Sequence, residues 1–362
     1  MKILIVSGTF WPENNPRSFR TTELARELTR LGHAVTVLIP QSSESRADFV
    51  AQNPVEFKSY VRVPERRRFL GISLIDRIIF RLLNQFLSYP ALPNMNRVIK
   101  AVATEGGYDL MITIAVPHAI HWAVGKLYSE GKRIAKTWIA DCGDPFMLAE
   151  SGNYRAPAYF AGLEKRWCRQ CDYITVPTEA SKDGYYPEFR DKIRVIPQGF
   201  DFSEVQRASY VPHQVPTFAY SGVFIPGKRD LRPVLEYLLE TKSAFELHVY
   251  TRQEEMFAPY RDALQGKLFL HSYIPRLELL EKLSTMDFLL NLENGVAIQT
   301  PSKLIDYALT GRPILSLDSS RLDTEKLDAF LRGDYTHQYR VENLEQYDIR
   351  NVARKFLELT EK

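Results

Sequence analysis

The chain has 362 residues, of which 45% are hydrophobic and 25% are charged, and its formal net charge is +3. This composition is typical of a soluble globular protein, and the length suits two domains better than one core. The small net charge argues against a nucleic-acid-binding protein. No segment is long enough to span a bilayer, and the short apolar run after Met1 is no signal peptide, so we expect a cytoplasmic chain.

Short buried-strand patterns alternate with helical patterns through the first half of the chain. A helix is expected over residues 16–32, because Leu24, Leu28 and Leu31 share one face and Gly32 suits the position just after a helix. The expected strands are residues 2–7, 34–40, 108–114, 135–141, 172–177 and 192–197. This alternation predicts a parallel sheet with helices on both faces.

A second alternating series follows, with strands expected at residues 217–222, 244–251, 267–274, 287–293 and 312–317. The polar segment 198–215 between the two series has the composition of a linker. We therefore predict an α/β protein with two Rossmann-like, doubly wound domains that face a central cleft. The predicted boundaries are 1–198 for the first domain, 199–345 for the second, and 346–362 for a C-terminal helix that packs back toward the first.

The chain has three cysteines, Cys142, Cys168 and Cys171, a low and odd number that argues against a disulfide framework. Cys168 and Cys171 form a lone C-x-x-C at the end of an expected helix. A redox site needs the start of a helix, and a zinc site needs a second ligand pair. Ordinary packing is therefore the favoured interpretation, and a redox or zinc role is the alternative.

Ligands of doubly wound sheets bind beyond the carboxyl ends of the strands, so the loops there carry the functional information. The loop after the first strand lacks both the G-x-G-x-x-G pattern of dinucleotide-binding proteins and the P-loop pattern of ATPases. Arg17 and Arg20 open the next helix, where their charge opposes the helix dipole. They are either a surface salt bridge or cleft residues that contact an anion or a sugar.

Two further loops of the first domain carry polar side chains. His118 begins a helix after the strand at 108–114, where an imidazole can exchange hydrogen bonds with hydroxyl groups; His121 is a weaker candidate. Asp141 and Asp144 follow the strand at 135–141. Paired carboxylates at this position are typical of acid–base catalysis or metal binding, and they are equally typical of a helix cap. We select His118 and Asp144 as catalytic candidates and Asp141 as a cleft residue.

The second domain offers a candidate anion site. Gly222 follows a strand and allows close approach of the backbone, and Lys228 and Arg229 stand just before a helix, although a solvated loop explains them as well. In “PSKLIDYALTGRPILSL” (301–317), Thr300 is an expected N-cap and Pro301 suits the first turn. Lys303 can reach an anion at this helix end, and Asp306 can accept hydrogen bonds from the vicinal hydroxyls of a ribose.

Several segments together resemble retaining glycosyltransferases of the B fold, most of all glycosyltransferase family 4 of the bacterial surface-polysaccharide type. They are “ELARELTRLGHAVTVL” (23–38), “PTEASKDGYY” (177–186), “RVIPQGFDFSEV” (194–205), “SGVFIPGKRDLRPVLEYL” (221–238) and “PSKLIDYALTGRPILSL” (301–317). The segments follow the family's order and cover nearly the whole chain.

The resemblance implies that the second domain binds a nucleotide-diphosphate sugar and that the first domain serves a glycan or lipid-linked acceptor. Lys228 or Arg229 together with Lys303 would neutralise the diphosphate, and the backbone around Thr300 and Ser302 would approach it. Asp306 would stand where the family usually has a glutamate bonded to ribose, and His118 would lie across the cleft near the sugar. Neither a cofactor nor a metal ion is expected, because cations and a helix N-terminus would stabilise the leaving diphosphate.

The chain also departs from the family pattern. The family's motif has two glutamates separated by seven residues, but Ile298 stands at the first position and the nearest upstream acid is Glu293. Val223 replaces the arginine that usually follows the glycine of the phosphate loop. The alternatives are therefore a nucleotide-sugar epimerase of the same fold, or a non-catalytic homologue that binds a partner or a membrane.

Residues 62–93 contain six arginines but only two acids, Glu65 and Asp76. Apolar residues recur with helical spacing from Ile72 to Phe86, with Arg77 and Arg81 on the other side. The favoured interpretation is a helix whose apolar face packs on the core. The alternative is a basic amphipathic helix that lies on the anionic inner surface of the cytoplasmic membrane, which would suit a lipid-linked acceptor.

Overall fold

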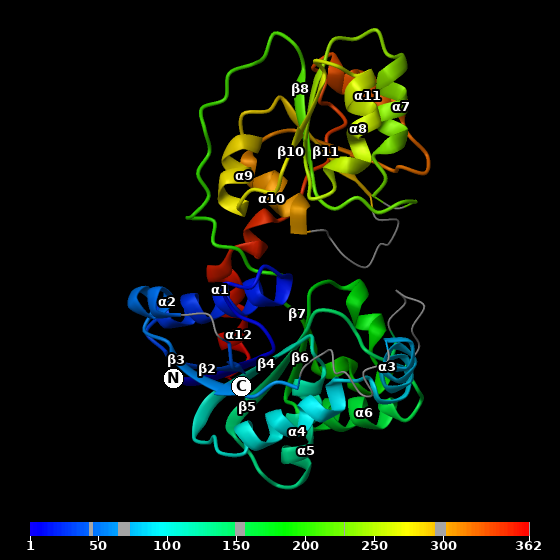
Figure 1. The fold of residues 1–362 in the computed structure, drawn as a ribbon. Helices are drawn as coiled ribbons and strands as arrows, with labels where there is room; N and C mark the ends of the chain where they lie inside the picture. The colour runs from blue at the N-terminus through cyan, green and yellow to red at the C-terminus, as the bar shows by residue number, and fades with distance from the viewer. Residues whose placement is uncertain (43–45, 64–72, 149–155, 228, 294–301, 362) are drawn as a thin grey trace. The chain divides into compact units, whose positions relative to one another are not determined.

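The computed structural model describes residues 1–42, 46–63, 73–148, 156–227, 229–293 and 302–361. The chain forms two compact units (Figure 1). Unit 1 comprises Met1–Phe200 and Gln346–Lys362, and unit 2 comprises Asp201–Glu345. Among the helices within these described ranges, none combines the length and hydropathy needed to cross a membrane.

Unit 1 is built on a seven-stranded sheet in the order β3-β2-β1-β4-β5-β6-β7, and every neighbouring pair is parallel. Its strands are β1 (Lys2–Ser7), β2 (Ala34–Pro40), β3 (Glu56–Tyr60), β4 (Tyr108–Ala115), β5 (Ala135–Cys142), β6 (Tyr173–Val176) and β7 (Ile193–Val195). This order is that of a doubly wound fold, so the carboxyl ends of β1, β4 and β5 lie at one edge.

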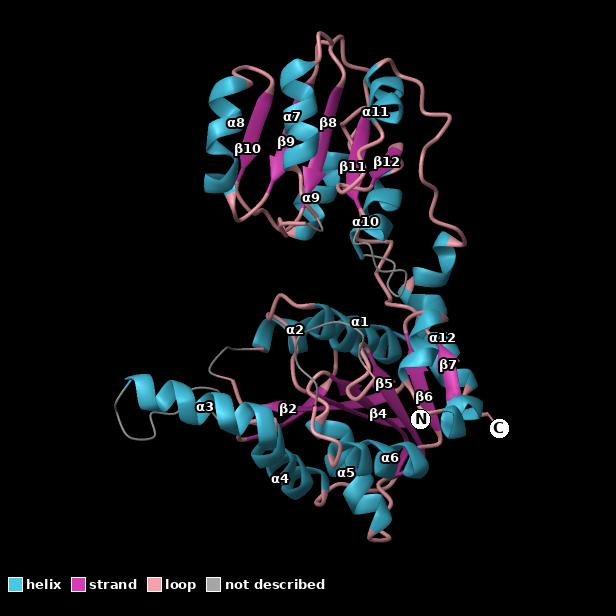
Figure 2. Cartoon of the chain, turned by 90° about the vertical axis from the view of Figure 1, so that its right-hand side faces the viewer, coloured by secondary structure: helices cyan, strands magenta, loops and turns pink. Residues whose placement is uncertain are grey.

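Helices cover both faces of this sheet (Figure 2). They are α1 (Pro16–Arg30), α2 (Ala47–Gln52), α3 (Ser73–Leu87), α4 (Ala91–Val102), α5 (Ala119–Ser129), α6 (Phe160–Gln170) and α12 (Ile349–Glu358), with short 3-10 helices at Ala180–Gly184 and Pro187–Lys192. Alternate residues of β1 supply two cores, because successive side chains of a strand point to opposite faces. Ile3 and Ile5 pack with α1 and α12, whereas Leu4 and Val6 pack with α4, α5 and α6.

Unit 2 repeats the arrangement with a five-stranded parallel sheet in the order β10-β9-β8-β11-β12. Its strands are β8 (Thr217–Ser221), β9 (Glu246–Tyr250), β10 (Leu268–His271), β11 (Phe288–Leu292) and β12 (Ile314–Leu317). Its helices are α7 (Arg232–Glu240), α8 (Ala258–Ala263), α9 (Arg276–Leu283), α10 (Ser302–Thr310) and α11 (Thr324–Leu331), with 3-10 helices at Glu254–Phe257 and Leu344–Tyr347. Helices α7 and α11 pack on one face of the sheet, and α9 and α10 pack on the other.

The chain leaves unit 1 and returns to it at neighbouring points. Phe200 and Asp348 form a parallel bridge, in which the N–H of Phe200 donates to the carbonyl of Tyr347 at 2.8 Å and the N–H of Ile349 donates to the carbonyl of Phe200 at 2.9 Å. Helix α12 then packs beside α1 through Phe356 (Figure 1). Unit 2 is therefore an insertion into unit 1.

Most of the expected linker is anchored to unit 2. Arg207 Nε donates to the carbonyl of Leu309 at 2.6 Å, and the Tyr210 hydroxyl donates to Asp287 at 2.7 Å. The guanidinium of Arg312 also lies 3.6 Å from the centre of the Tyr210 ring. The segment 198–215 therefore joins the two units, and from Arg207 onward its side chains bond to unit 2.

Helix α3 does not bury its apolar face. None of its described side chains is buried, and Leu82 and Phe86 are 52% and 55% exposed. The favoured prediction of a core-facing helix is therefore wrong, although the helix itself lies where the apolar spacing indicated.

Candidate functional site

The candidate anion site of unit 2 is centred on Lys303, in the first turn of α10. Its Nζ is buried and has no hydrogen-bond partner among the described residues, and it lies 4.4 Å from the centre of the Tyr220 ring at the end of β8. Burial and, to a smaller extent, the positive charge of Arg229 together lower the pKa of Lys303 to about 7. A buried ammonium group without an anion is energetically costly, so the site is suited to bind one.

Tyr307 fixes α10 against β8 and thereby positions Lys303. The N–H of Ser221 donates to the Tyr307 hydroxyl at 2.8 Å, and the Ser221 hydroxyl lies 3.1 Å from the same oxygen. Lys303 and Tyr307 are four residues apart, so they share one face of the helix. This spacing is visible in the sequence, but the hydrogen bond from Ser221 to Tyr307, 86 residues away, is not.

The loop after β8 supplies a second cation and a glycine. Within the described part of the chain, Arg229 Nε is buried without a hydrogen-bond partner, and the carbonyl of Arg229 accepts from the N–H of Ile225 at 3.1 Å in the same loop. Gly222 has a φ of +141°, which favours glycine, and a Cβ there would lie 4.0 Å from Lys303 Nζ. The structure thus brings together Gly222, Arg229 and Lys303 at the carboxyl end of β8 and the N-terminus of α10, an arrangement that binds anions.

Asp306 has a protein partner that the sequence did not reveal. Arg276, the first residue of α9, donates to Asp306 Oδ1 through Nε at 2.9 Å and through Nη2 at 2.5 Å. Burial raises the pKa of Asp306, and Arg276 opposes this increase. A contact between Asp306 and a ribose stays a prediction, and the Arg276 guanidinium now belongs to the same place.

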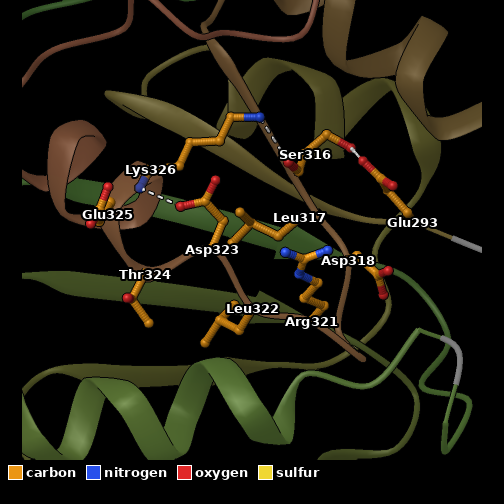
Figure 3. A pocket seen from close by; sticks show the side chains of 10 residues that line it. All are labelled: Glu293, Ser316, Leu317, Asp318, Arg321, Leu322, Asp323, Thr324, Glu325 and Lys326. Carbon is orange, nitrogen blue, oxygen red and sulfur yellow. Dashed lines mark hydrogen bonds between the residues drawn. The ribbon is translucent and has the colours of Figure 1, made fainter.

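A separate hollow of about 540 Å³ opens beyond β11 and β12 (Figure 3). Its wall includes Glu293, whose carboxylate accepts from the Ser316 hydroxyl at 3.1 Å, and Lys326, whose Nζ donates to the carbonyl of Ser316 at 3.1 Å. The Glu293 carboxylate is thus hydrogen-bonded to a residue of β12. Val223, the other departure from the family pattern, is 52% exposed.

Some predicted residues cannot be placed. Lys228, Thr300 and Ile298 lie outside the described residues, and the side chain of Ser302 is not described either. Their proposed contacts with a diphosphate stay predictions.

In unit 1, Arg20 and Asp141 form a buried ion pair. Arg20 Nε and Nη2 donate to the two oxygens of Asp141 at 3.1 and 2.8 Å, and Nη1 donates to the carbonyl of Pro197 at 2.6 Å. Thr175 also donates to Asp141 at 2.7 Å. Burial acts to raise the pKa of Asp141, but Arg20, Arg17 and Thr175 together hold it below its ordinary value. The surface salt bridge considered for Arg20 is wrong, because the pair ties α1 to β5 inside the unit.

Arg17 and Asp144 lie nearer the surface. Arg17 Nη1 is 3.6 Å from Asp141, and its guanidinium lies so close to Gly143 that a Cβ there would be 2.8 Å from Arg17 Cζ. Asp144 is exposed on the loop after β5. The structure therefore places Arg17, Asp141 and Asp144 around one loop at the carboxyl end of β5.

His118 and His121 have different environments. His118 precedes α5 and is buried, its Nδ1 has no hydrogen-bond partner, and burial lowers its pKa to about 4, so the imidazole is neutral at physiological pH. Its ring lies 5.2 Å from that of Phe146 in the loop after β5. His121 lies within hydrogen-bond distance of Thr113 (2.8 Å) and Cys142 (3.3 Å), which makes it a core residue.

The cysteines are packing residues. Cys142, Cys168 and Cys171 are free and buried. Burial raises the pKa of Cys168 and raises that of Cys171 to about 12, which disfavours the reactive thiolate.

Solved structures match the whole chain. They include the lipopolysaccharide outer core galactosyltransferase WaaB (TM-score 0.61, 12% identity, 99% of each chain covered) and HepE of Anabaena in complex with UDP and glucose (TM-score 0.64, 11% identity, 99% of this chain and 98% of that chain covered). A variant of TarM from S. aureus in complex with fondaparinux, α-GlcNAc-glycerol and UDP also matches (TM-score 0.58, 10% identity, 100% of each chain covered). These likenesses show that the two parallel-sheet units have the B fold of glycosyltransferases.

The sequence comparisons go one step further. The family model of Glycosyltransferase Family 4 matches residues 19–204, which is more than half of the chain. The chain therefore belongs to glycosyltransferase family 4. A comparison with curated proteins finds no match.

Proposed function

We propose that the protein transfers a sugar from a nucleotide-diphosphate sugar to a glycan or lipid-linked acceptor, with retention of configuration. The observation that carries the proposal is the pair of cations Lys303 and Arg229 beside the N-terminus of α10, whose buried Nζ and Nε atoms have no hydrogen-bond partner among the described residues. A diphosphate supplies two negative charges at such a site. HepE was solved with UDP and glucose and with UDP-glucose, which supports a nucleotide sugar as the donor.

In the proposed reaction, the bond between the anomeric carbon and the diphosphate breaks while the acceptor oxygen bonds to the same face of that carbon. The acceptor's proton passes to the departing diphosphate oxygen. Lys303 and Arg229 stabilise the negative charge that develops on this leaving group, so no nucleophile of the protein and no metal ion is required. Asp306 holds the ribose, and His118 and Asp144 of unit 1 contact the sugar or the acceptor.

The class of acceptor determines the place in the cell where the protein acts. A lipid-linked acceptor is held at a membrane surface, so we propose that the protein is peripheral on the inner face of the cytoplasmic membrane. The exposed apolar residues of α3, which belongs to unit 1, support this location.

Binding tests the donor site first. Calorimetry with UDP, GDP, dTDP, ADP and CMP, each also with its common sugars, is expected to find one diphosphate that binds the native protein and not Lys303→Ala. Lys326→Ala is the matched control, because this lysine also belongs to unit 2 but lies in the separate hollow. Absence of binding to every nucleotide would favour a non-catalytic homologue.

An activity assay then separates the enzymatic alternatives. With donor alone, a transferase slowly hydrolyses the nucleotide sugar, whereas an epimerase converts its sugar into another isomer. Release of free sugar with no isomer formed is the expected result.

A further inference from the structure

Helix α3 presents a continuous apolar stripe to solvent. The stripe consists of Leu74, Ile75, Ile78, Leu82 and Phe86, whose exposed fractions are 61%, 38%, 52%, 52% and 55%. From Ile75 the positions recur every three to four residues, and Leu74 lies four residues before Ile78, so all five lie along one side of the helix. A row of five large apolar side chains at such exposure marks an interaction surface.

The adjoining side of α3 faces the rest of unit 1. Asp76, Ile79, Phe80 and Leu83 are the half-buried residues of the helix, and the Phe80 ring packs edge-on against Tyr89 at 6.1 Å. Figure 2 shows α3 extending away from the sheet at the margin of the unit. The helix is therefore attached by one side, and its more apolar side is left without a partner within the described part of the chain.

Positive charge borders the stripe. Arg77 and Arg81, one turn apart, are both exposed, and Arg81 falls next to Leu74 around the helix axis. Arg97 and Lys100 are exposed on α4, which follows α3 directly. Asp76 is the single acidic residue of α3 and lies on its half-buried side.

We propose that the stripe docks on an anionic lipid bilayer, with α3 lying parallel to the membrane plane. Apolar side chains would enter the boundary between headgroups and acyl chains, and the arginines would contact lipid phosphates, which is how basic amphipathic helices bind membranes. A second copy of the chain is a poorer occupant, because a symmetric contact would bring the arginine borders of both helices together. The positive charge of the arginines therefore favours a negatively charged membrane surface as the partner of the stripe.

This inference deepens the proposed function by naming the element that holds unit 1 at the surface where a lipid-linked acceptor resides. Docking itself requires no donor chemistry. Nucleotide binding by unit 2 and vesicle binding by α3 can therefore succeed or fail independently, and measuring both on the same variants distinguishes the two proposals.

Vesicle flotation of the full chain tests the proposal. The protein is expected to float with vesicles of phosphatidylglycerol and phosphatidylcholine and not with phosphatidylcholine alone, and to detach as salt rises. Ile78→Glu and Leu82→Glu are each expected to weaken vesicle binding by about tenfold or more. Leu239→Glu is the matched control, since Leu239 lies on α7 of unit 2 and is 43% exposed.

Several results would overturn the proposal. One is that the native chain does not bind anionic vesicles. Another is that Leu82→Glu and Leu239→Glu float equally well. A native dimer in analytical ultracentrifugation that Leu82→Glu converts to monomer would assign the stripe to a second copy instead. Circular dichroism and nucleotide binding of Leu82→Glu check that loss of flotation does not come from unfolding; both are expected to match the native protein.

Discussion

Nucleotide binding to unit 2 is expected to take up a proton at Lys303. In the free protein, burial and the charge of Arg229 lower the pKa of this lysine to about 7. A bound diphosphate favours the charged ammonium and raises the pKa again, toward its ordinary value of 10.5. Since the free lysine is about half protonated at pH 7, binding would take up about 0.5 proton there and about 0.9 at pH 8.

The same linkage predicts how affinity depends on pH. Between pH 7 and pH 9 the protonated fraction of free Lys303 falls about 50-fold. The affinity for UDP, the nucleotide of the HepE complexes and the test ligand for this prediction, should therefore fall by a similar factor, or about 2.3 kcal/mol. Calorimetry in buffers of different ionisation enthalpy measures the proton uptake directly. Lys303→Arg retains a charge that does not titrate in this range, so its UDP affinity should vary little over the same pH interval.

Arg229 provides an internal check on this reasoning. Arg229→Gln removes a neighbouring positive charge, so it should raise the pKa of free Lys303 and move the loss of affinity to higher pH. An affinity that is constant from pH 7 to pH 9, with equal heats in all buffers, would refute the assignment of Lys303 to the diphosphate.

Three further changes test other parts of the structure. Gly222→Ala forces a side chain onto a φ of +141° and should destabilise unit 2 by about 1–3 kcal/mol in thermal unfolding, whereas Gly162→Ala, where a Cβ meets open space, should not. Asp306→Ala should weaken UDP binding by about 1–3 kcal/mol in calorimetry, and an unchanged affinity would sink its role at the ribose. Asp141→Asn should leave Arg20 without its counter-charge and lower the free energy of unfolding by about 3–5 kcal/mol in urea, with UDP affinity unchanged. Because the pKa of Asp141 is lowered in the folded state, the native pair stabilises the fold above the ordinary value of 3.8 and loses that effect as pH falls through the lowered value; Asp141→Asn should lack this loss at acid pH.

The strands were predictable because buried parallel strands are continuous apolar runs in the sequence. Strand β3, with the sequence EFKSY, was missed because it is an edge strand with mostly polar residues and only Tyr60 is buried. The helix α3 was predicted, but its orientation was not. The periodicity of apolar residues identifies the apolar face of a helix, but it does not show whether this face packs on the protein or contacts a membrane.

Single site residues were predictable only where neighbours in the sequence carry the signal. Lys303 follows an expected helix start, and the structure has it in the first turn of α10. The partner of Asp306 is Arg276, 30 residues away, and that of Asp141 is Arg20, 121 residues away. Such pairs depend on which helices and strands the sheet order brings together, so the spacing of residues along the chain does not predict them.

Because Phe200 and Asp348 are bridged neighbours, both ends of unit 2 join unit 1 at a single place. Residues 201–345 thus form a cassette with two adjacent junctions, and deleting or exchanging it requires no rearrangement of the seven-stranded sheet. A gene that recombined at these two points would keep unit 1 and receive a complete new unit 2 in one event. The fold thereby allows the two units to diversify separately.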